Sequence, residues 1–277
     1  MSELTVTLID VGWGDSILIE SVDANHVSRF ALVDCNDYET ERSSHVFVKR
    51  LFQRRDIDFE NTLRNFDWVL LTHGHADHAR GMKRMLETYG TRQFWYPKSV
   101  PSTSYGTLIR FANRSSRIEH HQAIDATKVL PAFGAVSLQV LWPEYDVIDG
   151  DNENNNSVVL ALTLGGVTFV LTGDAEASNW PAINPRIPAT TRVFQSPHHG
   201  AQNGMFDEQG AASWLGSLPA GTVVAISCHL KPHGHPHPDV IHELEARGVE
   251  HFRTDRQYHL VFRTDGAGVT REFTHLG

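Results

Sequence analysis

Cysteine is scarce in this 277-residue chain, which contains only Cys35 and Cys228. A disulfide scaffold and a zinc site built from cysteines are therefore excluded, although one buried disulfide is compatible with the count. Long apolar runs are also missing. The longest nearly apolar stretch, 158–171, is interrupted by two threonines and a Gly-Gly pair and is shorter than the roughly 18 residues that a membrane span needs. The sequence therefore predicts a protein without a transmembrane helix.

The start of the chain lacks the features of a secretion signal. Its first ten residues, MSELTVTLID, carry no basic segment before an apolar core and no small-residue cleavage site. They have the pattern of a strand instead. This favours a cytoplasmic protein that does not associate with a membrane.

Basic residues are outnumbered, with 24 Lys and Arg against 33 Asp and Glu, which gives a formal net charge of −9. The chain is 40% hydrophobic and 21% charged, which is typical of a soluble globular protein. No Gly/Ser/Pro-rich or highly charged linker divides it. We therefore expect a single domain spanning residues 1–277.

Short strand patterns and amphipathic helix patterns occur in both halves of the chain without strict alternation. Strands are predicted at 4–9, 16–20, 30–33, 66–71, 136–141, 158–164, 167–172, 192–196, 222–228, 250–253, 257–264 and 268–274. Helices are predicted at 39–55, 80–89, 102–114, 203–216 and 237–247. This mixture favours an α/β (α+β) fold in which outer helices cover two mixed sheets.

Histidine is unusually common, with seventeen in the chain, and its densest group follows the strand at 66–71. The segment Thr72-His-Gly-His-Ala-Asp-His78 places four metal-ligating side chains within six residues. On a loop, His73 and His75 can point to one side while Asp77 and His78 point to another, so the segment can supply two adjacent metal ions. Imidazole and carboxylate ligands suit zinc, manganese or iron. The alternative, a solvated polar loop, is disfavoured by this density of ligands.

The His-x-His-x-Asp-His segment resembles the hallmark loop of the metallo-β-lactamase fold superfamily. Further segments are similar to the ComEC-type branch, the DNA-uptake competence proteins, and occur in the order that this branch uses. They are residues 8–16, 32–34, 156–159, 171–174, 197–200 and 234–238. The resemblance implies a single αββα sandwich, a centre of two divalent metal ions, zinc or manganese, and nuclease or other phosphodiesterase chemistry.

The resemblance also implies roles for individual residues. His73 and His75 would bind the first metal, Asp77 and His78 the second, and Asp174 would bridge both. Asp174 is well placed for this role, because it follows the apolar strand 169–172 and Gly173 lets the backbone turn. His235 would be the last ligand of the second metal, with His233 and His237 as competitors.

Three further residues would support the chemistry. Asp34 would orient the histidine loop from behind the metal ligands, unless it is simply a turn residue at a strand end. His199, or failing that His198, would act as an acid or transition-state stabiliser, the alternative being a structural histidine. Asp77 would also orient or deprotonate the attacking water.

Two departures from the superfamily pattern stand out. A histidine is usual between the first loop and the bridging aspartate, and here only His120 and His121 are available, in a segment that reads as a surface connection. We favour a first metal with fewer protein ligands over a site completed by one of these histidines. Trp13 is the second departure, because glutamine is common at that position.

The stretch from Arg80 to Ile118 has eight basic residues and one acidic residue, so it is strongly positive within a negative protein. This asymmetry favours nucleic acid as the partner, with Arg110, Arg114 and Arg117 as candidate contacts. The stretch also contains aromatic residues that could stack on bases or belong to the core. They are Phe94, Trp95, Tyr96, Tyr105 and Phe111.

The sequence thus predicts a metal-dependent hydrolase, a phosphodiesterase or nuclease that acts on nucleic acid. The net negative charge suits a second substrate class better, namely small or lipid-linked phosphodiesters. The third alternative is a non-catalytic role, as a metal-stabilised subunit with a protein partner in a larger defence or uptake complex. Hydrolysis of a strained lactam is disfavoured.

Overall fold

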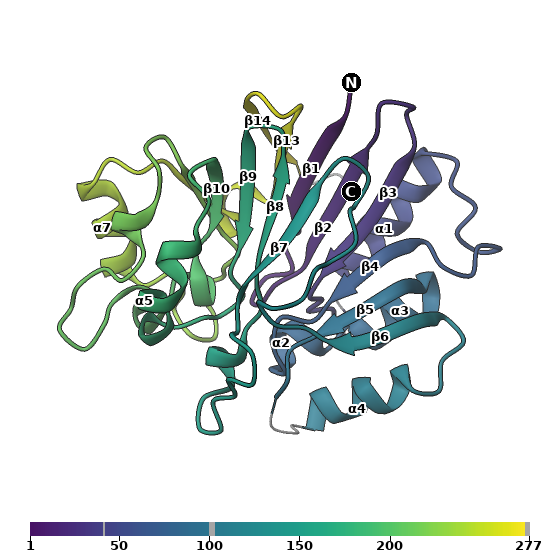
Figure 1. The fold of residues 1–277 in the computed structure, drawn as a ribbon, viewed down its shortest axis with the longest axis horizontal. Helices are drawn as coiled ribbons and strands as arrows, with labels where there is room; N and C mark the ends of the chain where they lie inside the picture. The colour runs from purple at the N-terminus through teal and green to yellow at the C-terminus, as the bar shows by residue number, and fades with distance from the viewer. Residues whose placement is uncertain (41, 100–102, 275–277) are drawn as a thin grey trace.

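The computed structural model describes residues 1–40, 42–99 and 103–274, and Figure 1 shows their arrangement. An eight-stranded sheet has the order β14-β13-β1-β2-β3-β4-β5-β6, and its neighbours are antiparallel from β14 to β3 and parallel from β3 to β6. Its strands are β1 (Glu3–Leu8), β2 (Ile17–Val22), β3 (Ser28–Val33), β4 (Phe66–Leu70), β5 (Thr91–Tyr96), β6 (Ile118–Ala123), β13 (His259–Thr264) and β14 (Val269–Thr274).

The second sheet has six strands in the order β12-β11-β10-β9-β8-β7. Its strands β9 to β12 are parallel, and β7 and β8 complete it with antiparallel pairing. The strands are β7 (Ser137–Trp142), β8 (Val159–Leu164), β9 (Val167–Leu171), β10 (Thr191–Gln195), β11 (Val223–Ile226) and β12 (His251–Arg253).

Helices cover the outer faces of both sheets (Figure 1). Residues of α1 (Ser43–Arg54), α3 (Met82–Tyr89) and α4 (Thr103–Ala112) pack against the eight-stranded sheet, and residues of α5 (Trp180–Ile183) and α7 (Pro238–Ala246) pack against the six-stranded sheet. The short helices α2 (Ala76–Ala79), α6 (Gln202–Met205) and α8 (Thr254–Gln257) lie in connections. The predicted αββα sandwich with two mixed sheets is confirmed.

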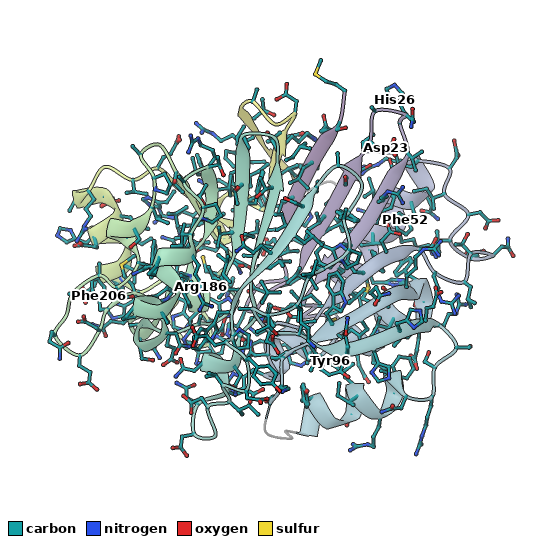
Figure 2. All side chains as sticks on the ribbon, in the orientation of Figure 1. Asp23, His26, Phe52, Tyr96, Arg186 and Phe206 are labelled. Atoms are coloured by element: carbon teal, nitrogen blue, oxygen red, sulfur yellow. The ribbon has the colours of Figure 1, made fainter. Side chains whose placement is uncertain are left out.

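The core between the sheets follows from alternation along the strands. Leu4, Val6 and Leu8 of β1 are buried there in the same core cluster as the β8 residues Leu160 and Leu162. Burial of such side chains contributes roughly 1.5–3 kcal/mol each. Side chains also fill the layers between each sheet and its helices, as Figure 2 shows. Because most strands are buried on both faces, their apolar patterns were readable in the sequence.

Three expectations about elements were wrong. The helix predicted at 203–216 is α6 followed by a turn, because the Asp207 carboxylate accepts hydrogen bonds from the backbone of Gln209 and Ala211 and closes a loop there. Strand β5 was overlooked. So was β6, and His120 and His121 therefore lie in a strand rather than in a surface connection. β6 is an edge strand with exposed polar side chains, so it lacks the alternation by which a strand is recognised.

The parallel strands bring distant segments together at one end of the sandwich. Asp34 follows β3, Thr72 and His73 follow β4, Asp174 follows β9 and Ser196 follows β10. Carboxyl ends of parallel strands are where α/β proteins place their ligands. Among the described residues, no helix has the length and apolar character to cross a membrane.

Candidate metal centre

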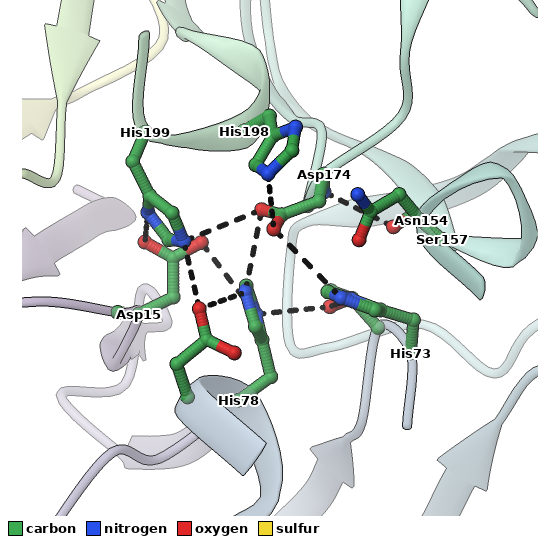
Figure 3. Close-up of polar contacts among 12 residues, drawn as sticks. Asp15, His73, His78, Asn154, Ser157, Asp174, His198 and His199 are labelled. Atoms are coloured by element: carbon green, nitrogen blue, oxygen red, sulfur yellow. Dashed lines mark hydrogen bonds and ion pairs between the residues drawn. The ribbon is translucent and has the colours of Figure 1, made fainter. Parts of the chain in front are cut away.

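Four buried side chains meet where the two sheets open at these strand ends (Figure 3). Asp15, His78, Asp174 and His199 each offer one ligand atom, and these atoms all lie within 4.8 Å of one another. We call this group the His–Asp cluster. Its members come from the β1–β2 turn, from α2, and from the segments after β9 and β10. The cluster therefore depends on the whole fold and not on one loop.

The two carboxylate oxygens of Asp174 face different pairs of histidines. Its Oδ1 lies 3.3 Å from Nε2 of His78 and 3.5 Å from Nε2 of His199. Its Oδ2 lies 3.8 Å from Nε2 of His73 and 3.7 Å from Nε2 of His198. Asp77 joins the first pair, with its Oδ2 3.3 Å from Nε2 of His199 and 3.6 Å from Nε2 of His78. A carboxylate shared between two cations requires this two-sided placement.

Several of these atoms are buried without a hydrogen-bond partner among the described residues. They are Nε2 of His73, Nε2 of His78, Oδ1 of Asp15 and Oδ1 of Asp174. Buried polar atoms are normally paired, so such a convergent group of unpaired atoms calls for a ligand. Imidazole nitrogens and carboxylate oxygens are the donors that zinc and similar divalent ions bind. The residues present therefore fit a metal centre.

Side chains behind the cluster fix its histidines. Oδ2 of Asp34 lies 2.7 Å from Nδ1 of His78, and the Thr72 backbone N–H and hydroxyl both donate to the Asp34 carboxylate. This places the proton of His78 on Nδ1 and directs Nε2 into the cluster. Nδ1 of His199 lies 3.0 Å from the carbonyl oxygen of Ser227, which fixes that ring in the same way.

The charged side chains of the cluster shift one another's pKa values. Burial alone disfavours the charged form of Asp174, but the imidazoles of His199 and His78 outweigh it and hold the pKa of Asp174 well below its ordinary value. Burial likewise opposes protonation of His199, but Asp174 and Asp15 raise its pKa to about 9. The carboxylates of Asp174 and Asp15 thus favour the protonated, positively charged form of the His199 imidazole. Metal ions compete with these protons for the same ligand atoms.

The remaining histidines of the loop and of the 233–237 segment differ in position. His75 is exposed, and its ring packs edge-on against His73 at a centroid distance of 4.8 Å. His235 is half-buried, 5.8 Å from the ring of His198, and burial and the neighbouring imidazoles lower its pKa to about 4, which keeps it in the neutral, metal-binding form. His233 packs on Trp13, and His237 caps α7 by accepting the N–H of Asp239.

His198 and His199 occupy a turn directly after β10, in which both residues have positive φ angles of 51° and 54°. His199 is buried and belongs to the cluster, whereas His198 also approaches Glu176, with Nδ1 3.5 Å from Oε1. Both histidines predicted for catalysis therefore lie at the centre. Their roles there stay predictions.

Asp15 was not singled out from the sequence, although it belongs to the cluster. The side-chain amide of Gln195 donates to Oδ2 of Asp15 at 2.7 Å. The backbone N–H of Asp15 donates to the carbonyl oxygen of Asp77 at 3.2 Å. The preceding Gly14 has a φ of 106°, and a side chain there would approach the Asp77 carbonyl to 2.5 Å. The signal was available in the sequence as an acidic residue in a glycine-rich turn between two strands.

The structure does not bring His120 or His121 to the cluster. Nδ1 of His121 lies 2.9 Å from the hydroxyl of Tyr96, on the helix-covered side of the sheet, and the exposed His120 approaches Glu119. Among the described contacts of these two histidines, none is with His73. Instead, His198 supplies an imidazole beside His73 at the same oxygen of Asp174.

The basic stretch is only partly near the centre. Four of its aromatic residues, Phe94, Trp95, Tyr96 and Tyr105, are buried in the core, which leaves no free ring face there for base stacking. Phe111 is partly buried against the same core. Arg117 precedes β6 and donates to the carbonyls of Thr62 and Leu63. It lies at the amino end of the parallel strands, about 20 Å from their carboxyl ends for strands of this length.

The other two arginines predicted to contact substrate are not joined to the cluster by any described contact. Arg110 lies on α4, where its Nη2 donates to the hydroxyl of Thr107 at 3.0 Å, and Arg114 lies in the turn between α4 and β6. Substrate binding by Arg110, Arg114 and Arg117 stays a prediction.

Residues 5–208 match the sequence model of the metallo-beta-lactamase superfamily, and the chain belongs to this superfamily, whose members are generally hydrolytic. An alignment over 275 residues, which covers 95% of this chain, shows 27% identity to ComE operon protein 3 of Bacillus subtilis (strain 168). The chain spans about a third of the length of that relative (33%). The crystal structure of the metallo-beta-lactamase fold protein YhfI from Bacillus subtilis is similar in fold, with a TM-score of 0.60 and 16% identity over 95% of this chain and 100% of YhfI.

Proposed function

We propose that this chain is a phosphodiesterase that cleaves nucleic acid at a centre of two divalent metal ions. The observation that carries the proposal is the placement of Asp174, whose two oxygens face two separate sets of imidazoles. A centre with two adjacent cations suits phosphodiester hydrolysis, because it can stabilise both the attacking and the leaving oxygen. Membership of the metallo-beta-lactamase superfamily supports a hydrolytic role.

Two ligand sets are supported by the contacts around Asp174 and, for His75, by the resemblance alone. His73, His75 and His198 would hold the first ion with Oδ2 of Asp174, which gives this ion the third histidine that the sequence did not identify. Asp77, His78 and His199 would hold the second ion with Oδ1 of Asp174. Asp15 belongs to the same cluster as His78 and His199, and His235, whose ring lies 5.8 Å from that of His198 and 6.4 Å from that of His199, would complete the second site.

When bound, the two ions would supply Lewis-acid charge and a water of lowered pKa, which is the nucleophile that hydrolysis needs. The chain's own residues prepare the site. Asp34 holds the proton on Nδ1 of His78 and so keeps its Nε2 free. Oδ2 of Asp77 faces the centre and can accept a proton from the attacking water. Burial of the cluster excludes bulk water and strengthens each of these interactions.

The choice of nucleic acid as substrate is supported by the resemblance to DNA-uptake competence proteins and by Arg80, which lies two residues after His78 of the histidine loop. Small or lipid-linked phosphodiesters are the second candidate. They are favoured by the net charge of −9 and by the distance of Arg117 from the centre. The third reading is that the chain serves as a metal-stabilised, non-catalytic subunit in a complex with a protein partner.

A substrate panel tests the proposal. Protein loaded with zinc or with manganese is incubated with single-stranded DNA, duplex DNA, RNA and bis(p-nitrophenyl) phosphate. We expect turnover of the small diester and of at least one nucleic acid, and no turnover in Asp77→Ala. Turnover of the small diester alone would favour the second candidate, and no turnover with any metal would favour a non-catalytic subunit.

A further inference from the structure

We infer that Trp13, Tyr38 and Arg80 form a subsite for single-stranded nucleic acid beside the His–Asp cluster. In this subsite Arg80 binds a phosphate that neighbours the scissile one, and Trp13 stacks on the adjoining base. The inference rests on the proposed function, because it names the part of the chain that recognises the substrate of the same centre.

The guanidinium of Arg80 is held in place from two directions. Its Cζ lies 4.0 Å from the ring centroid of Tyr38 and 6.0 Å from that of Trp13. Its Nη1 donates to Oδ1 of Asn36 at 3.0 Å. Asn36 is itself buried, and its amide group donates to the carbonyl oxygen of Trp13. A guanidinium held against an aromatic face keeps donors at its edge for a phosphate.

This stack is built on the two segments that supply carboxylates to the centre. Trp13 precedes Asp15 by two residues, and Arg80 follows Asp77 by three. The backbone N–H of Asp15 donates to the carbonyl of Asp77, and Gly14 has no room for a side chain between these segments. The stack is therefore tied through the backbone to the two segments that supply Asp15 and Asp77 to the centre.

Among the described residues, none neutralises the charge of Arg80. Its side chain is exposed, and it makes no ion pair with any residue that the structure describes. Arg271 offers a contrast, since its guanidinium also lies over an aromatic ring, at 4.8 Å from the centroid of Phe252, but it is paired with Glu250. An anionic ligand would supply the missing partner of Arg80.

Trp13 offers the aromatic surface that a base needs. Its side chain is half-buried, and the exposed His233 packs against it with a centroid distance of 4.9 Å and an interplanar angle of 57°. Stacking on an aromatic side chain is tolerant of sequence and is a main source of affinity for single strands.

The test measures binding of a short fluorescent single-stranded oligonucleotide by anisotropy, with the metal-loaded protein and again with a chelator present. Arg80→Ala and Trp13→Ala should each weaken binding by about tenfold. Arg80→Ala should also lower the slope of log affinity against log salt by about 0.7, the value for one phosphate contact. Trp13→Ala should have little effect on a strand that is abasic throughout. Arg271→Ala is the matched control and should bind like the parent.

Two further measurements keep the outcomes distinct. Melting temperatures show whether each variant is folded, and Trp13→Phe, which keeps an aromatic face, should retain most of the affinity. If folded Arg80→Ala and Trp13→Ala bind like Arg271→Ala, the subsite is refuted. If those variants lose affinity while the parent protein cleaves no diester, the subsite stands and the proposed hydrolysis fails.

Discussion

Asp34 and His78 form a buried pair in which a carboxylate oxygen lies 2.7 Å from Nδ1 of the imidazole. The pair joins the end of β3 to helix α2, which are far apart in the sequence. Because Nδ1 is held by Asp34, Nε2 of His78 is the nitrogen presented to the cluster. Metal sites depend on such partners behind their ligands for orientation and for ligand basicity.

The first prediction concerns this pair. Asp34→Asn keeps the shape of the side chain but replaces the carboxylate with an amide, so His78 is no longer held in one tautomer. We expect metal affinity to fall by about 10- to 100-fold. Competition titration with a chromophoric chelator measures this. Asp265→Asn, in the exposed β13–β14 turn, is the control and should leave the affinity unchanged.

The second prediction concerns pH. Burial lowers the pKa of His199, but Asp174 and Asp15 outweigh this effect and raise it to about 9 from an ordinary value of 6.5. A raised pKa in the folded state stabilises the fold fully below pH 6.5, and that contribution is lost as the pH rises to about 9. In metal-free protein we expect a loss on the order of 3 kcal/mol over this range.

Urea unfolding of the metal-free protein at several pH values measures this loss. His199→Gln removes the titrating group, so its stability should depend less on pH between these limits. A parent protein whose stability is flat or rises over the same range would contradict the assigned charge pairing.

The third prediction separates two neighbouring histidines. His235→Ala should reduce metal occupancy, because this ring lies beside those of His198 and His199. His237→Ala should leave metal content unchanged and cost about 1 kcal/mol of stability, because His237 caps α7. Elemental analysis and urea unfolding of both variants measure the two effects. The opposite pattern would show that the ligand of this segment is His237.

The fourth prediction concerns Asp77. Asp77→Ala should abolish hydrolysis while the melting temperature of the metal-free protein changes by only a few degrees. The side chain lies in the short helix α2 and is not part of the apolar core between the sheets. Circular dichroism and turnover of bis(p-nitrophenyl) phosphate check both parts. Turnover at the parent rate would remove Asp77 from the mechanism.

Much of the fold was predictable because its signals are local. Strands such as β8 and β9 are nearly continuous apolar runs, and the histidine loop packs its ligands into six residues. The edge strand β6 was not predictable from alternation, since its exposed side chains are polar. The 203–216 segment was misread because a turn at Asp207 interrupts an apparently helical pattern.

The candidate site was predictable residue by residue only where a motif names the residue. The structure brings the side chains of His73, Asp77, His78 and Asp174 together, and their roles as metal ligands stay predictions. Asp15 was not found, because its role depends on a contact between the β1–β2 turn and the Asp77 segment that only the tertiary structure reveals. The position of His198 beside His73 likewise depends on the left-handed turn after β10.

The most direct test of the account is the metal content of Asp174→Ala. The central claim is that one carboxylate serves two metal ions, one at each oxygen. Elemental analysis of the parent protein after loading and gel filtration should give about two ions per chain for a dinuclear centre, and in Asp174→Ala both sites should lose occupancy together. Full double occupancy in Asp174→Ala, or a single ion in the parent protein, would contradict the claim.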